Sequence, residues 1–176
     1  DGSPVSAQYE KMAFITEEGS FFPSMTAYEY GFFLEDFFPR FNMERYRELI
    51  KFFQLDLYKK IKTYSTGQKS KLEIVAGFSK GAKYILMDEP FMGSDIFARQ
   101  DFLKLMISSL KTDETILITT HLIDEIEQFI DRAVILRHGR IKADFYIDDI
   151  RREEKTLEEV MMETVGYTDD RYKTLF

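Results

Sequence analysis

The segment Tyr84-Ile85-Leu86-Met87-Asp88-Glu89-Pro90 joins a short apolar run to two consecutive carboxylates and a proline. A continuous apolar run of this length, followed by turn-forming residues, is typical of a strand buried within a parallel sheet. Such a strand delivers its last residues to the carboxyl edge of the sheet, where open α/β folds bind ligands. Taken alone, the pattern is explained at least as well by a buried strand that ends in a solvated acidic turn.

The two carboxylates suit two chemical roles. Asp88 can hold Mg²⁺ directly or through water, because this ion takes hard oxygen ligands and keeps several waters. Glu89 can act as a general base toward an attacking water if its surroundings tune its proton affinity. The segment therefore predicts a candidate site for metal-assisted hydrolysis at one sheet edge.

The residues that follow this segment alternate between strand and helix. Apolar residues at 115–119 and 133–136 predict further strands, and 141–146 pairs with 133–136 across a turn at His138-Gly139. This alternation favours a parallel sheet covered on both faces. Two helical stripes are expected between the strands, at Leu103, Met106, Ile107 and Leu110 and at Leu122, Ile126, Phe129 and Ile130.

The residues that precede this segment are mainly helical in pattern. Thr26 and Glu29 have the spacing of a capping box at the start of one helix. Asn42 can cap a second helix, and Ser65 can cap a third that ends at Gly81. One short strand is expected at 12–16, so a strand and a helical region lie before the α/β half.

Two further positions could contact phosphate. The stretch 65–69 places Ser65 and Gly67 at a helix N-terminus, where unpaired N–H groups and the helix dipole favour anions. His121 follows the predicted strand 115–119 and could hydrogen-bond a phosphate or orient a water. A simple helix cap and a structural histidine are the alternative explanations for these residues.

Composition excludes several other classes of protein. The 176 residues carry 24 Lys and Arg against 31 Asp and Glu, so the formal net charge is −7 and general binding to nucleic acid is disfavoured. There is no cysteine for disulfides or thiolate sites. No apolar run approaches the roughly 18 residues of a membrane span. The length suggests one domain, and the first residue, Asp1, suggests processing or a piece of a longer protein.

The order of these motifs resembles the ATP-binding domain of ABC transporters. Residues 64–68 resemble its LSGGQ signature, with Tyr64 for Leu and Thr66 for the first Gly, and 84–90 resemble its Walker B strand. Residues 119–121 match the switch-histidine loop. The family's Q-loop glutamine falls on Glu17, which could ligate Mg²⁺ but cannot donate a hydrogen bond as an amide does. The resemblance to this family extends over about residues 1–165.

The resemblance implies a fold and a division of the chain. The implied fold is α/β: a P-loop NTPase-like parallel sheet core, truncated at the N-terminus, with a helical subdomain. The implied regions are 1–25 for the Q-loop, 26–82 for the helical subdomain, 83–150 for the α/β core and 151–176 for the C-terminal helix and tail.

The resemblance also implies the site, with ATP and Mg²⁺ bound between two facing domains. The implied roles are nucleotide binding in trans for Ser65, Thr66, Gly67 and Gln68, metal binding for Asp88 and Glu17, catalysis for Glu89 and His121, and a D-loop position for Asp95. The implied partners are a second nucleotide-binding domain and a membrane permease, at the cytoplasmic face of the membrane, without nucleic acid. Aromatic candidates for the permease groove are Phe21, Phe22, Tyr28, Phe32 and Phe33, for which core packing is the alternative.

One family motif is absent from the sequence: there is no G-x-x-x-x-G-K-[ST] loop to cradle phosphates. We therefore expect an ATPase subunit without its front end, an uncovered apolar side of the sheet, and no ATP turnover by the chain alone. Two alternatives remain. One is a natural interaction module that offers only a signature face, and the other is an ABC ATPase that works outside transport.

Overall fold

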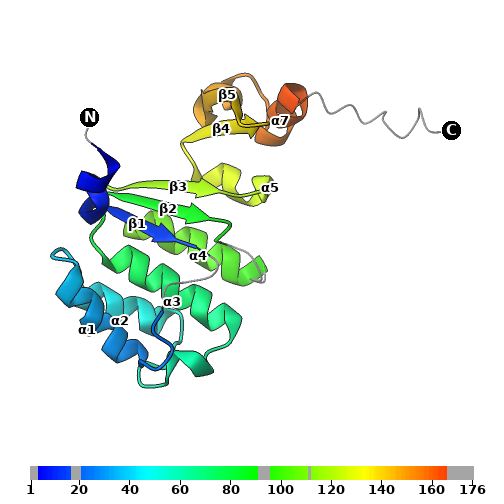
Figure 1. The fold of residues 1–176 in the computed structure, drawn as a ribbon. Helices are drawn as coiled ribbons and strands as arrows, with labels where there is room; N and C mark the ends of the chain where they lie inside the picture. Colours follow the sequence, from blue (N-terminus) through cyan, green and yellow to red (C-terminus); the bar gives the residue numbers. More distant parts are fainter. Residues whose placement is uncertain (1–3, 17–20, 91–95, 111, 166–176) are drawn as a thin grey trace. The chain divides into compact units, whose positions relative to one another are not determined.

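The computed structural model describes residues 4–16, 21–90, 96–110 and 112–165 (Figure 1). The chain divides into two compact units, Asp1–Thr120 and His121–Phe176, and each is described by itself. The division into four regions expected from the resemblance stays a prediction.

The first unit is built on a three-stranded parallel sheet. Its strands are β1 (Met12–Ile15), β2 (Tyr84–Asp88) and β3 (Thr115–Thr119), in the order β1-β2-β3. The parallel α/β core is therefore confirmed, with β2 in the centre. A 3₁₀ helix, η1 (Val5–Lys11), precedes β1 and was not expected from the sequence.

Four helices and a short 3₁₀ turn complete this unit. In chain order they are α1 (Ala27–Phe37), α2 (Met43–Phe52), η2 (Ile61–Thr63), α3 (Thr66–Ser79) and α4 (Ile96–Ser109). Figure 1 shows α3 between the sheet and the pair α1 and α2. The cluster of helices before β2 is thus a layer beside the sheet rather than an extension of it.

The expected helix starts are confirmed. Thr26 and Glu29 form a complete capping box at α1, and the Asn42 side chain accepts a hydrogen bond from the Arg45 N–H at 2.9 Å at α2. Helix α3 ends at Ser79, and Gly81 follows with a left-handed φ of +66°. A Cβ at Gly81 would meet the Arg40 carbonyl oxygen, so this turn has both conformational and steric reasons for glycine.

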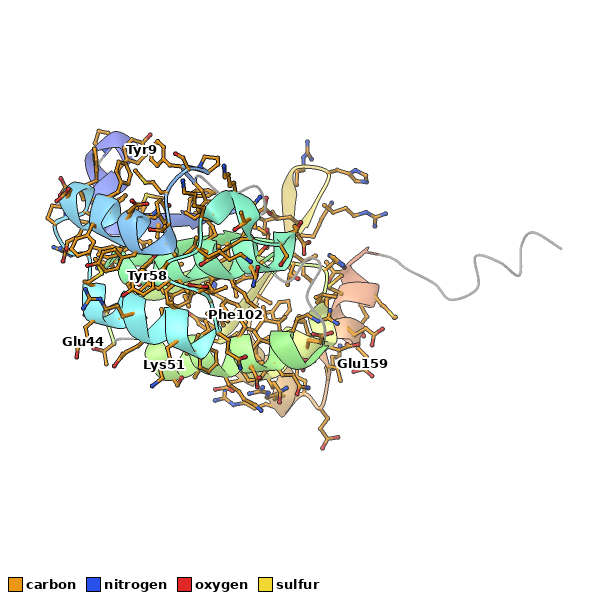
Figure 2. The ribbon with its side chains drawn as sticks, turned by 90° about the horizontal axis from the view of Figure 1, so that it is seen from below. Tyr9, Glu44, Lys51, Tyr58, Phe102 and Glu159 are labelled. Carbon is orange, nitrogen blue, oxygen red and sulfur yellow. The ribbon has the colours of Figure 1, made fainter. Side chains whose placement is uncertain are left out.

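One face of the sheet packs against α3 and α4. Ala13, Ile15, Ile85 and Met87 point to this face and are almost fully buried. The rings of Phe78 in α3 and Phe102 in α4 meet edge to face, with centroids 6.2 Å apart (Figure 2).

Helix α4 turns a slightly different side to the core than its sequence stripe predicts. Phe102, Leu103 and Met106 are buried, whereas Ile107 is 43% exposed. Phe102 occupies the place at the α3 contact because its ring reaches Phe78. The prediction that Leu103 and Met106 lie in the core is confirmed, and the same prediction for Ile107 was wrong.

The other face of the sheet is open in the described part of the chain. Phe14, Leu86 and Leu117 lie side by side across the three strands, and Phe14 and Leu117 are 56% and 58% exposed. The expectations of a sheet covered on both faces and of an uncovered apolar side both stay predictions. Tyr84, also on this face, is partly exposed.

The second unit contains an antiparallel hairpin and short helices. Strands β4 (Arg132–Arg137) and β5 (Arg140–Tyr146) pair as expected across His138 and Gly139, both of which have positive φ. Two positive φ values in a two-residue loop match the twist of a tight hairpin. The helical pieces are α5 (Ile123–Ile126), η3 (Glu127–Phe129), α6 (Ile147–Arg152) and α7 (Leu157–Val165).

The second unit has its own small core. Ile147, Ile150 and Leu157 are buried together, and Ala133 and Phe145 of the hairpin pack against them. The stripe expected at 122–130 forms only one helical turn and a 3₁₀ turn, and α6 was not expected at all. In the part of the chain that the structure describes, no helix has the length and apolarity needed to cross a membrane.

Gly77 sets the closest approach between α3 and β1, and this gives a first prediction. A Cβ at Gly77 would lie 2.5 Å from the side chain of the buried Ile15. We expect Gly77→Ala to destabilise the fold by roughly 1–3 kcal/mol, because overpacking forces the sheet and helix apart. Chemical denaturation monitored by circular dichroism measures the change.

Gly67 offers the matched control on the same helix. A Cβ there would meet nothing within 4 Å. Gly67→Ala should leave stability unchanged or raise it by up to about 1 kcal/mol through helix propensity. Equal effects of the two substitutions would contradict the close packing of α3 on β1.

Candidate functional site

Asp88 is the last residue of β2 and lies beside Thr119, the last residue of β3. The Thr119 hydroxyl donates a hydrogen bond to the Asp88 Oδ1. Asp88 is exposed at the carboxyl edge of the sheet. The carboxylate is therefore both accessible and oriented, which suits a metal ligand that must reach an ion beyond the edge of the sheet.

Glu89 follows immediately, in a backbone conformation that is unusual for glutamate. Its φ is +43°, in the left-handed region that favours glycine. Its N–H donates to the carbonyl oxygen of Thr119 at 2.9 Å, which extends the β2–β3 pairing by one residue. A non-glycine residue held here costs free energy and is frequent at functional sites. The catalytic role of Glu89 stays a prediction.

Sequence reasoning named Thr119 only as part of the switch-histidine loop and missed its contact with the two acidic residues. Thr119 contacts both carboxylate-bearing residues, Asp88 through its side chain and Glu89 through its main chain. The signal that could have found it is the strand register, because two parallel strands of equal length place their last residues side by side.

The signature segment begins α3. The Ser65 hydroxyl accepts a hydrogen bond from the Gln68 N–H at 3.2 Å, and the Gln68 side chain accepts one from the Ser65 N–H at 3.0 Å. Ser65, Thr66 and Gly67 are exposed. Ser65 and Gln68 thus form a capping box, and the next two residues leave the start of the helix open to solvent.

This cap differs electrostatically from two others in the chain. At α1 and α7 the boxes close with carboxylates, those of Glu29 and Glu159. At α3 the corresponding side chain is the neutral Gln68, and the first turn of α3 has no acidic residue. The positive end of the α3 dipole is therefore not offset by a carboxylate in its own first turn.

Tyr64 precedes the signature and fixes the loop that leads into it. Its hydroxyl donates to the Asp56 carbonyl oxygen, and its ring is buried. Burial raises the pKa of Tyr64 to about 12, with a smaller contribution from the charge of Asp56. The hydroxyl therefore stays protonated as a donor at neutral pH, which a leucine at this position could not provide.

The structure brings some predicted site residues together and leaves others unplaced. Asp88 and Glu89 are joined through Thr119, while Ser65 and Gln68 are joined to each other at α3. His121 is the first residue of the second unit and is exposed. Glu17 and Asp95 lie outside the described residues. The roles of all these residues remain predictions.

Asp88 is the candidate metal ligand that the described residues orient. Among the described residues, no three Asp, Glu or His side chains form a cluster that could hold an ion. Asp88 alone supplies a hard oxygen ligand oriented by a neighbour, which fits Mg²⁺ because this ion often uses one or two carboxylates together with water and substrate phosphates.

The central strand of the parallel sheet ends at Asp88 and is followed by Glu89, and α3 begins with the sequence Ser-Thr-Gly-Gln at 65–68. This arrangement has a counterpart among known proteins. A family model described as ABC transporter matches residues 3–92, just over half of the chain. The chain belongs to the ABC transporter family.

The part of the chain that aligns covers about half the length of its curated relatives. The ABC transporter ATP-binding protein YtrB of Bacillus subtilis is 28% identical over 145 residues, which cover 82% of this chain and 50% of YtrB. The uncharacterized ABC transporter ATP-binding protein YdbJ of the same organism is 30% identical, covering 77% of this chain and 45% of YdbJ. The chain therefore spans about half the length of these relatives.

A solved structure supports the ABC fold over most of the chain. The structure of an ATP-binding subunit of an ABC transporter superposes with a TM-score of 0.75 at 29% identity, covering 89% of this chain and 69% of that one. The P-loop NTPase-like α/β fold expected from the resemblance is confirmed.

The capping box at α3 gives a second prediction. Ser65→Ala removes the acceptor for the Gln68 N–H, so we expect a loss of stability of about 0.5–2 kcal/mol. Thermal and urea unfolding of the chain measure the loss. Ser65→Thr is the control, because it keeps a hydroxyl at the cap and should lose much less; equal losses would contradict the capping role.

Proposed function

We propose that this chain forms most of an ATP-binding subunit of an ABC transporter, which couples ATP hydrolysis to movement of a membrane permease. The observation that carries the proposal is the pair of acidic residues at the end of β2 in a chain of this family, with the Asp88 carboxylate and the Glu89 N–H both hydrogen-bonded to Thr119. The pair would suit a reaction in which one carboxylate binds a metal and the other a water.

In the proposed reaction, the two carboxylates have separate tasks. Asp88 binds the metal with the oxygen that remains available beside its Thr119 bond, or through a water. Glu89 orients the attacking water and accepts its proton as the water attacks the terminal phosphate. Mg²⁺, when bound, offsets the charge that develops on the phosphate oxygens. His121 contacts the same phosphate in this proposal.

The start of α3 is proposed to bind ATP held by a second domain. Support comes from its electrostatics, because the cap of Ser65 and Gln68 is neutral and the dipole end is not offset in its first turn. Gly67 has open space around its Cα, which allows a phosphate close to the backbone. The partner is accordingly a second nucleotide-binding domain of the same kind, with the signature of each facing the ATP of the other.

The phosphate-gripping loop belongs, in this proposal, to polypeptide that the 176 residues do not contain. Two observations support this: the chain spans only about half the length of its curated relatives, and one face of the sheet exposes Phe14 and Leu117. Parallel sheets are normally covered on both faces. We call the chain together with such a P-loop segment the intact subunit.

An aromatic patch on α1 and its flanking loops is the proposed permease contact. We define the patch as Phe22, Tyr28, Phe32, Phe33, Phe37 and Tyr58. Its rings form two groups. The Phe33 ring meets those of Phe22 and Phe37, at centroid distances of 4.8 and 4.6 Å, and the Tyr28 ring meets those of Phe32 and Tyr58.

The exposure of the patch separates it from ordinary core packing. Phe32, Phe37 and Tyr58 are 39%, 66% and 73% exposed, and Figure 2 labels Tyr58 near α1 and α2. Tyr30, whose ring stacks on that of Phe33, is instead buried. Phe21, the remaining candidate, packs edge to face on Tyr30 and so belongs partly to the core. An exposed aromatic surface suits an amphipathic partner helix.

Hydrolysis gives the third prediction. In the intact subunit, Glu89→Gln should reduce the ATP hydrolysis rate by at least about 100-fold, because an amide cannot accept the proton from water. ATP binding, measured with a fluorescent nucleotide analogue, should be retained. The 176-residue chain alone should show no magnesium-dependent turnover.

Three results would count against this assignment. Unchanged hydrolysis in the Glu89→Gln subunit would remove Glu89 as the base. Robust hydrolysis by the 176-residue chain would contradict the need for a P-loop segment. A gene that starts directly before Asp1 would favour a P-loop-less interaction module instead.

The aromatic patch gives the fourth prediction. Phe32→Ser should weaken co-purification of the intact subunit with its permease, since it removes an exposed ring of the patch. Phe52→Ser is the matched control, because Phe52 is similarly exposed, at 47%, but lies on α2 outside the patch. Equal co-purification of both variants would contradict the proposed contact.

A further inference from the structure

Thr119 occupies a position from which one residue contacts both the carboxylate of Asp88 and the main chain of Glu89. Its hydroxyl donates to Asp88 Oδ1, and its carbonyl oxygen accepts from the Glu89 N–H at 2.9 Å. The two bonds use different groups of Thr119, so they act together without competing. Asp88 and Glu89 are consecutive, so fixing both limits the movement of the whole turn after β2.

The side-chain bond has a specific consequence for Asp88. A carboxylate rotates about its terminal torsion with a broad energy minimum, so an isolated Asp side chain samples many orientations. The Thr119 hydroxyl engages Oδ1 and leaves Oδ2 for a ligand. Partners of this kind around metal-binding carboxylates often change metal affinity or activity by 10–100-fold when removed.

The position of β3 makes this role possible. The register of the two parallel strands aligns Thr119 with Asp88, and β3 is joined to β2 along its length, from Thr115 beside Tyr84 onward. The hydroxyl is thus attached to the same rigid sheet as the carboxylate it contacts. A donor on a loop would not hold the carboxylate as firmly.

We propose that Thr119 is a positioning residue of the ATPase site, which orients Asp88 for its metal through its hydroxyl while its main chain holds Glu89. The inference rests on the proposed function and gives Thr119 a role of its own, beyond its place in the segment 119–121. Thr119 touches neither substrate nor metal in this role, and acts through Asp88.

The first experiment uses the 176-residue chain and needs no activity. The carboxyl ¹³C resonance of Asp88 is followed by NMR at constant neutral pH in three variants. Thr119→Val removes the hydroxyl at similar volume and should shift this resonance, whereas Thr119→Ser should restore it. Thr115→Val is the control at the other end of β3, and should leave it unchanged. An unchanged resonance in Thr119→Val would overturn the proposal.

The second experiment uses the intact subunit. Thr119→Val should raise the Mg²⁺ concentration for half-maximal hydrolysis, or lower kcat, by roughly 10–100-fold, with the KM for ATP changed by no more than about 2-fold. Thr119→Ser should recover most of the loss, and Thr115→Val should match the unmodified subunit. A merely structural role would not give rescue by serine together with a selective change in Mg²⁺ dependence.

The outcomes separate this inference from the function on which it rests. If the unmodified subunit hydrolyses ATP and Glu89→Gln stops it, while Thr119→Val behaves like Thr115→Val, the role of Thr119 is overturned and the function stands. If the unmodified subunit does not hydrolyse ATP, both are overturned.

Discussion

The parallel pairing of β2 with one strand on each side is the constraint on which the first unit depends. Its partners, β1 and β3, come from stretches that lie far apart in the chain, before and after the helical layer. The pairing aligns Ile15 with Met87, whose side chains share the buried face, and it sets Thr119 beside Asp88. The same hydrogen-bonded ladder therefore organises the core and the candidate site.

Local signals in the sequence were sufficient for the helix starts and for the strands themselves. The caps at Thr26, Asn42 and Ser65 form as expected, since each depends on residues no more than three apart. The turn at His138-Gly139 forms for the same reason. Sequence reasoning also identified Asp88 and Glu89 as candidate site residues. An apolar strand followed by carboxylates can be recognised without knowing which strands lie beside it.

Features that depend on distant residues were not visible in the same way. The contact of Thr119 with Asp88 requires the register between two strands, and the burial of Phe102 in place of Ile107 requires the position of Phe78 on another helix. The short helix α6 packs Ile147 and Ile150 into a small local core that the charged sequence around them obscures. The exposed apolar face of the sheet was expected only because the sequence has no G-x-x-x-x-G-K-[ST] loop.

The left-handed backbone at Glu89 has a consequence for how this sequence is maintained. Glycine or asparagine would adopt φ near +43° at lower free energy, so glutamate makes the folded state less stable than it could be by about 1 kcal/mol. Random substitution in a protein selected for folding alone would tend to replace Glu89 with one of those residues. The stability of the fold therefore does not account for a carboxylate at this turn.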